Sequence, residues 1–212
     1  MAGVMNCDIH LTDKLAVYFE EVRKGLDLPW VPPCVHRSGA MFKVVDGALV
    51  YALGALKNVG VEAMRLVQEA RADKPFVNLF DFARRVDLKK VGKRPLEMLA
   101  RAGAFDQLDA NRRRVFDALD ALSAYSTAVH DQKNSNQVSL FGEAGDDLPE
   151  PRLLPLDDWL PAERLGEEHK AVGFYLSGVP ASALICHGQP LCLLPEVGHD
   201  RCVRGHAFLR EP

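Results

Sequence analysis

An internal repeat limits how this chain can fold. Leu56-Lys57-Asn58-Val59-Gly60 and Leu88-Lys89-Lys90-Val91-Gly92 have the same order of leucine, two polar residues, valine and glycine, and a helical pattern follows each copy. A glycine after an apolar residue reaches positive φ at little cost and turns the chain into the next helix. The first amides of that helix have no partner within it. The repeat therefore predicts two hairpins with main-chain donors directed outward.

Main-chain donors at a helix start are typical of phosphate sites, because the helix dipole also favours an anion there. We expect the amides of Val59, Gly60, Val91 and Gly92 to bind phosphate, and Asn58 to tolerate a left-handed turn. The predicted contact residues are Lys57, Asn58, Val59, Gly60, Lys89, Lys90, Val91, Gly92, Lys93 and Arg94. Such contacts ignore base sequence and weaken with salt. The alternative is two ordinary helical turns with solvated lysines.

The charges are distributed unevenly along the chain. The net charge is only −3, but ten basic residues face four acids between Arg84 and Arg114, whereas nine acids face two arginines between Glu143 and Glu168. Only the first segment is suited to a polyanion. Asp146, Asp147, Asp157 and Asp158 in the second segment could imitate a two-metal centre. Because Pro-rich sequence offers them no scaffold, we interpret these four as part of a solvated acidic linker.

Apolar spacing predicts a mainly α fold. Helices are expected over 12–23 with Thr12 as N-cap, and then over 61–71, 79–85, 95–102 and 111–125. The segment 41–51 is typical of a β-hairpin that turns at Asp46-Gly47, and no other segment suggests a strand. From Thr127 to about Pro155 the composition is that of a linker. A helix from Pro161 to about Leu176 follows, and residues 179–212 show no clear period.

One short segment stands out within the linker. Gln137, Val138, Ser139, Leu140 and Phe141 place two large apolar side chains next to each other where nothing else can bury them. An exposed Leu-Phe pair indicates a pocket that receives it, either on this chain or on a partner.

Neither membrane insertion nor a disulfide framework is expected. No apolar run approaches the roughly 20 residues of a membrane span, and the N-terminus is not a signal peptide. Five cysteines without repeated spacing indicate reduced thiols, so we expect a cytoplasmic protein. The Cys and His residues between Cys186 and His206 include no Cys-x-x-Cys pair, which argues against zinc.

Several motifs in fixed order resemble the alpha subunit of bacterial DNA polymerase III. They are Asn6-Cys7-Asp8, Thr12-Asp13-Lys14, the stretch from Gly54 to Gly60, Phe80-Asp81-Phe82, the stretch from Arg101 to Asp106, Gln137 to Phe141, and the stretch from Gly173 to Gly178. The resemblance covers residues 1 to about 178 and a downstream slice of that longer protein. After Ser177-Gly178 the chain departs from the family pattern.

The resemblance implies five regions. They are a remnant of the polymerase fingers (1–50), a tandem helix-hairpin-helix domain that binds double-stranded DNA (51–126), a linker with a sliding-clamp motif at Gln137 to Phe141 (127–160), a helix (161–178) and a divergent tail (179–212). The catalytic carboxylates and their Mg²⁺ would lie upstream, so we expect no catalytic residue, metal or cofactor in this fragment. Expected partners are duplex DNA, the sliding clamp and other replicase subunits. Met1 would be an internal methionine and the tail an out-of-frame extension.

Other functions remain open at this point. A helix-hairpin-helix DNA glycosylase also grips DNA with such a hairpin, and Asp73, Lys74 and Asp81 are its only nearby catalytic candidates. It leaves the repeat and the Leu-Phe linker unexplained. A fragment of an error-prone polymerase paralogue and a pure protein-interaction module are further alternatives.

Overall fold

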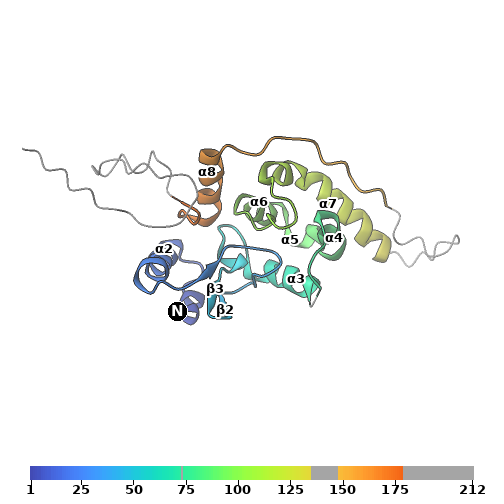
Figure 1. Ribbon diagram of the computed structural model, residues 1–212. Coiled ribbons are helices and arrows are strands. Elements are labelled where there is room, and N and C mark those ends of the chain that lie inside the picture. Colours follow the sequence, from blue (N-terminus) through green and yellow to red (C-terminus); the bar gives the residue numbers. More distant parts are fainter. Residues whose placement is uncertain (73, 135–147, 179–212) are drawn as a thin grey trace, which may run out of the picture. The chain divides into compact units, whose positions relative to one another are not determined.

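The computed structural model describes residues 1–72, 74–134 and 148–178 (Figure 1). The chain divides into two units after Gly178, and the elements below belong to the first unit, Met1–Gly178. Its elements are α1 (Ala2–Cys7), α2 (Thr12–Glu20), the π-helical turn η1 (Glu21–Gly25), β1 (Trp30–Val31), β2 (Lys43–Val45), β3 (Ala48–Val50), the 3₁₀ turn η2 (Leu53–Ala55), α3 (Val61–Arg71), α4 (Leu79–Arg85), α5 (Leu88–Val91), α6 (Lys93–Arg101), α7 (Arg112–Asn134) and α8 (Pro161–Val172). The fold is mainly α, as predicted. Within these ranges no helix is both long and apolar enough to cross a membrane.

A small sheet follows the first two helices. The predicted hairpin is confirmed: β2 and β3 pair antiparallel, and Asp46 (φ 51°) and Gly47 (φ 78°) form the turn. The expectation of no other strand is wrong, because β1 pairs in parallel with β3 and gives the order β1-β3-β2. Thr12 is the first residue of α2, and Leu11, without a side-chain cap, takes the N-cap position expected for Thr12.

The central helices agree with the sequence pattern in part. α3 and α4 have the predicted bounds, and α4 begins where the Asn78 side chain accepts a hydrogen bond from the amide of Asp81 (2.7 Å). α5 was not predicted, and α6 begins two residues earlier than expected. These differences lie beside Gly92, where the backbone turns between the two helices.

The linker does not begin at Thr127 as predicted, because α7 continues to Asn134. Its buried face extends through Tyr125 and Val129. Ser126 is fully buried on that face, and its hydroxyl donates to Val86 O (2.9 Å) and accepts from Leu88 N (3.2 Å). Ser126, directly before the predicted linker, is therefore a packing residue, since its hydrogen bonds are satisfied by another part of the chain.

The segment 148–160 has no regular secondary structure but follows the helices closely. It passes over α6 and α7 to reach α8 (Figure 1). Leu156 O accepts from Asn111 Nδ2, and the rings of Trp159 and Phe116 lie 5.8 Å apart. α8 then ends at Val172 rather than near Leu176, because Gly173 adopts a left-handed conformation (φ 98°) that closes it.

The core joins all these elements. Edge-to-face ring pairs hold α4 to its neighbours: Phe82 lies 5.1 Å from Phe105 and 5.1 Å from Phe76 between ring centroids. Buried leucines of α6 and α7 complete the core, among them Leu96, Leu99 and Leu119. Burial of such side chains contributes about 1.5–3 kcal/mol each, which makes these helices one packed body.

Gly103 is a site where a single added methyl group should destabilise the fold. It has φ +77°, and a Cβ there would overlap the guanidinium of Arg112, which is itself held by Asp106. We predict that Gly103→Ala lowers the free energy of unfolding by about 2–4 kcal/mol, from left-handed strain and displacement of the arginine. Urea unfolding followed by circular dichroism measures this change.

Gly166→Ala is the matched control. Gly166 lies inside α8, and no atom lies within 4 Å of the position that a new methyl group would take, so alanine should leave stability unchanged or raise it by up to about 1 kcal/mol. Equal stabilities for the two variants would show that Arg112 does not need the space above Gly103.

Candidate nucleic-acid interface

The first copy of the repeat is a tight turn that leads into α3. Val59 N donates to Leu56 O (3.1 Å), and both of these apolar side chains are buried. Asn58 has φ 58°, so the prediction that it takes the left-handed conformation is confirmed. Gly60 follows with an ordinary φ of −83° and is the N-cap residue of α3. The prediction of positive φ at this glycine is therefore wrong.

The second copy is a hairpin between two helices. The Asp87 side chain caps α5 by accepting from Lys90 N (3.4 Å), and Leu88 and Val91 are buried beneath it. Gly92 then has φ 90° and ψ 155°, a conformation open almost only to glycine, and is the N-cap residue of α6. Here the predicted role of glycine is confirmed.

The two copies have different backbones because the residues before them differ. Asp87 can cap a helical turn, whereas Ala55 at the corresponding position has no polar side chain. The first copy therefore turns early, at Asn58, and the second turns late, at Gly92. Similar sequences reach the same result, a helix whose N-cap residue is glycine, by different routes.

Three of the four amides predicted to bind phosphate are not open donors. Val59, Val91 and Gly92 already use their amides within the chain, the last two toward Asp87 O (3.2 Å) and Leu88 O (2.9 Å). These three amides therefore do not bind phosphate in this conformation. Gly60 N has no hydrogen-bond partner in the described part of the chain. Beyond it, the first amides of α3 and α6 are open, since neither helix has a side-chain cap.

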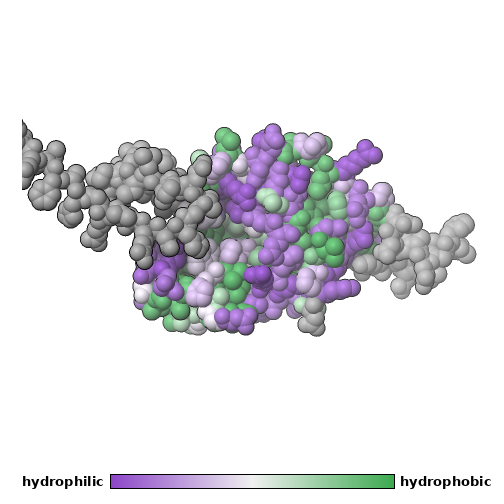
Figure 2. Space-filling model, viewed as in Figure 1, coloured by the Kyte–Doolittle hydropathy of each residue, from purple (hydrophilic) through white to green (hydrophobic). Residues whose placement is uncertain are grey.

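The predicted cations fall into two groups. Lys90 is paired with Asp87 (3.2 Å) and Lys93 with Asp120 (2.6 Å), and the hydrogen bond to Asp120 raises the pKa of Lys93. Lys89 and Arg94 are exposed and have no ion pair with any residue that the structure describes. Hydrophilic residues predominate on the face seen in Figure 2. In the second copy of the repeat, the unpaired charges are therefore those of Lys89 and Arg94.

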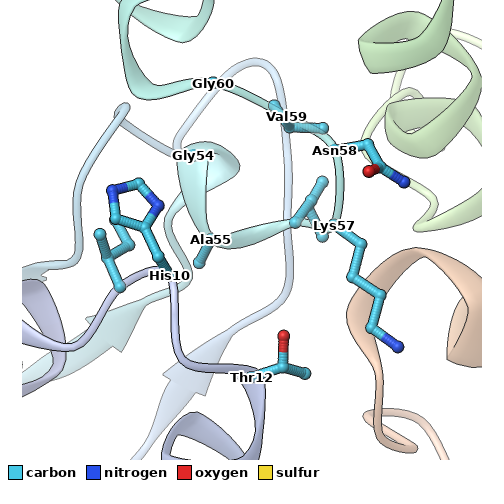
Figure 3. A pocket seen from close by; sticks show the side chains of 10 residues that line it. His10, Thr12, Gly54, Ala55, Lys57, Asn58, Val59 and Gly60 are labelled. Carbon is cyan, nitrogen blue, oxygen red and sulfur yellow. The ribbon is translucent and has the colours of Figure 1, made fainter.

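Lys57 is held by the end of α8. Its amide donates to Ala171 O (2.8 Å), and its side chain runs toward that segment (Figure 3). A Cβ on Gly173 would lie 2.7 Å from Lys57 Cε and 3.0 Å from Nζ, so the lysine packs across that glycine. The side chain is half-buried, and its contribution to a ligand is mainly the charge at its end.

The same turn lines a surface pocket of about 480 Å³ (Figure 3). His10 and Thr12, at the start of α2, form its other side together with Ile9. These residues were not predicted as site residues, since nothing in their local pattern relates them to a turn more than forty positions away. His10 is exposed and adds a polar ring beside the N-terminus of α3.

Acids of the segment 143–168 pair with arginines of the basic segment 84–114. Arg84 pairs with Glu150 (2.7 Å), Arg101 with Glu167 (3.2 Å), and Arg112 lies 3.7 Å from the buried Glu168. Asp158 accepts from Arg113 N (3.2 Å) and pairs with Arg164 (2.7 Å). The interpretation as a solvated linker acid is therefore wrong for Asp158, and much of the basic charge is used inside the molecule.

The clamp motif and the tail lie outside the described residues. This applies to Gln137, Val138, Ser139, Leu140 and Phe141, and to everything after Gly178. Within the described ranges, no group of His, Cys, Asp and Glu side chains is arranged to hold a metal ion.

Two glycine-capped helices packed as one body define a helix-hairpin-helix protein, and residues 27–115 match the family model of the helix-hairpin-helix motif. The chain is 41% identical over 186 residues to DNA polymerase III subunit alpha of Caulobacter vibrioides. The aligned residues cover 87% of this chain and 16% of the relative. The corresponding protein of Thermus aquaticus is 38% identical (85% and 14% covered), and that of Bacillus subtilis is 33% identical (86% and 16% covered).

The chain therefore belongs to the DNA polymerase III alpha-subunit family, of which it represents a segment. It spans about one sixth of the length of these relatives. The resemblance found in the sequence is confirmed over this region.

The two glycines of the repeat should respond differently to alanine. Gly92→Ala forces a side chain into a glycine-only conformation, and we predict a loss of about 1–3 kcal/mol in the free energy of unfolding. Gly60→Ala keeps an ordinary φ with no atom near the new methyl group, so its effect should stay below about 1 kcal/mol. Thermal and urea unfolding of both variants provide the comparison. If Gly60→Ala proves as costly as Gly92→Ala, the two hairpins share one backbone after all.

Proposed function

We propose that this chain binds double-stranded DNA through its sugar-phosphate backbone, as the duplex-binding segment of a bacterial replicative polymerase. The observation that carries the proposal is the pair of open helix starts at α3 and α6, with the unpaired cations Lys89 and Arg94 beside the second. Helix N-termini and nearby cations favour phosphate, and phosphate contacts fix position without reading bases. A polymerase needs such sequence-independent contact.

We further propose that Gln137 to Phe141 tethers the chain to a sliding clamp. The flanks of this motif are both attached to α7, which ends at Asn134 on one side and carries the extended segment 148–160 on the other. Leu140 and Phe141 would enter an apolar pocket on the ring, with Gln137 bonding at its rim. A short peptide binds modestly alone, but joined to a DNA site on the same chain it gains effective concentration.

The nucleotidyl transfer of the family belongs, in this proposal, to parts of the longer protein that carry the carboxylates and Mg²⁺. This segment would bind the duplex and attach to the sliding clamp, and it would have no catalytic centre. Its partners would be duplex DNA, the clamp and other replicase subunits. It would act in the cytoplasm, where bacterial DNA is replicated.

A glycosylase function has less support. Its candidate Asp81 accepts a hydrogen bond from Val77 N (3.0 Å) and pairs with Arg85 (3.4 Å), which gives this carboxylate a structural role at the start of α4. Asp73 lies outside the described residues.

Removal of the two unpaired cations should weaken duplex binding. We predict that Lys89→Gln/Arg94→Gln binds blunt duplex DNA about tenfold more weakly at low salt, and that the slope of log K against log salt falls by about 2, since two phosphate contacts are lost. Fluorescence anisotropy over a salt series measures both quantities. Duplexes of unrelated sequence should give the same result.

Lys90→Gln/Lys93→Gln is the control with the same change in charge. Because both lysines are already paired with Asp87 and Asp120, the slope should fall by less than about 1. If the two double variants lose equal affinity, general charge rather than the hairpin geometry attracts DNA.

Primer extension by the purified chain should give no incorporation.

Leu140→Ala/Phe141→Ala should abolish binding to a bacterial sliding clamp while duplex affinity stays within about twofold, because the apolar anchor is lost and the hairpins are untouched. Surface plasmon resonance with immobilised clamp is the measurement. Glu143→Ala, just outside the motif, serves as the control. Clamp binding retained by the double variant would refute the tether.

A further inference from the structure

A pocket lined by basic residues lies on one face of the small sheet, separate from the surface pocket at His10. Its volume is about 530 Å³, within the range of small-molecule sites. Strand pairing places Lys43, Val50 and Val31 in one row, because Lys43 is opposite Val50 and Val50 is opposite Val31. Residues opposite each other project to the same face. This row gives the pocket an apolar floor with a lysine at its edge.

Arginines from two other elements complete the pocket. Arg71, the last residue of α3, is fixed by hydrogen bonds to Val35 O (2.9 Å) and Ser38 O (2.8 Å). Arg37, from the turn between β1 and β2, is exposed. Neither Arg37 nor Lys43 has an ion pair among the residues that the structure describes, and Asp46 is the one acid of the lining. The pocket therefore holds an excess of positive charge that the protein does not use.

A planar ring also lines the pocket. His36 Nδ1 lies 2.8 Å from Gln107 Oε1, so Nδ1 carries the proton and donates. The ring stacks on Phe76, with centroids 6.3 Å apart and planes at 29°. Its Nε2 is buried and has no partner in the described part of the chain. A ring whose orientation is fixed in this way offers a planar surface against which a base can stack.

We propose that this pocket binds a nucleotide unit of single-stranded nucleic acid. Arg37 and Lys43 would contact the phosphate, and the base would lie against the valine floor and His36. A duplex is too wide for a pocket of this volume, whereas one unstacked nucleotide fits it. The inference rests on the proposed function in one respect: the single strand would continue from the duplex that the hairpins hold.

The test compares a blunt duplex with the same duplex carrying a single-stranded overhang, using the full chain. Wild type should bind the overhang form more tightly. Arg37→Gln/Lys43→Gln should lose about fivefold affinity for the overhang form and stay within about twofold for the blunt form, since two phosphate contacts are lost only where a single strand is present. Circular dichroism establishes that the variant is folded.

Two arms keep the outcomes separate. Arg23→Gln/Lys24→Gln removes the same charge from exposed residues of η1 and should change neither affinity beyond about twofold. A free nucleoside triphosphate should compete poorly with the overhang form. Strong competition would assign the pocket to free nucleotides and overturn the proposal. Equal affinity of wild type for the blunt and overhang forms would also overturn it. If wild type binds neither form, the proposed duplex function fails as well, whereas loss of the overhang advantage alone refutes only this site.

Discussion

The rest of the structure depends on the ion-pair network around Arg112. Its guanidinium lies over Gly103 and bonds Asp106, the residue as a whole is 8% exposed, and Glu168 on α8, which is 2% exposed, lies 3.7 Å away. Glu168 in turn accepts hydrogen bonds from the amides of Leu176 and Ser177. A buried pair of this kind adds little net stability, but an alternative arrangement that leaves either charge unpaired is costly. The network therefore selects how α8 docks on α6 and α7.

This docking decides which charges are left for a ligand. The acidic segment returns along the helices and neutralises arginines that would otherwise form one broad basic surface, as at Arg84 and Arg101. Several cations stay unpaired in the described part of the chain, and among them Lys89 and Arg94 lie next to the open amides of α6.

Much of the fold was predictable where the signal is local. The turn at Asp46-Gly47 and the bounds of α3 and α4 follow from residues within a few positions, namely turn residues, an Asn cap and apolar spacing. β1 was missed because two residues carry no period, and its partner β3 lies almost twenty positions away. The extension of α7 was missed because the composition from Thr127 onward is that of a linker. The contacts of the neighbouring Ser126 with Val86 and Leu88, far away in sequence, are set by packing.

The sequence by itself determined the family, the two glycine-containing turns and the helices that follow them, because backbone conformation and helix capping depend on near neighbours. Tertiary structure decided which amides and cations are free to bind. The amide of Lys57 donates to Ala171 O, and Lys93 pairs with Asp120, 27 positions away along the chain. The pocket at Lys43 and the one at His10 likewise arise from residues far apart in sequence, since a side chain's partners are set by packing and not by its neighbours in the chain.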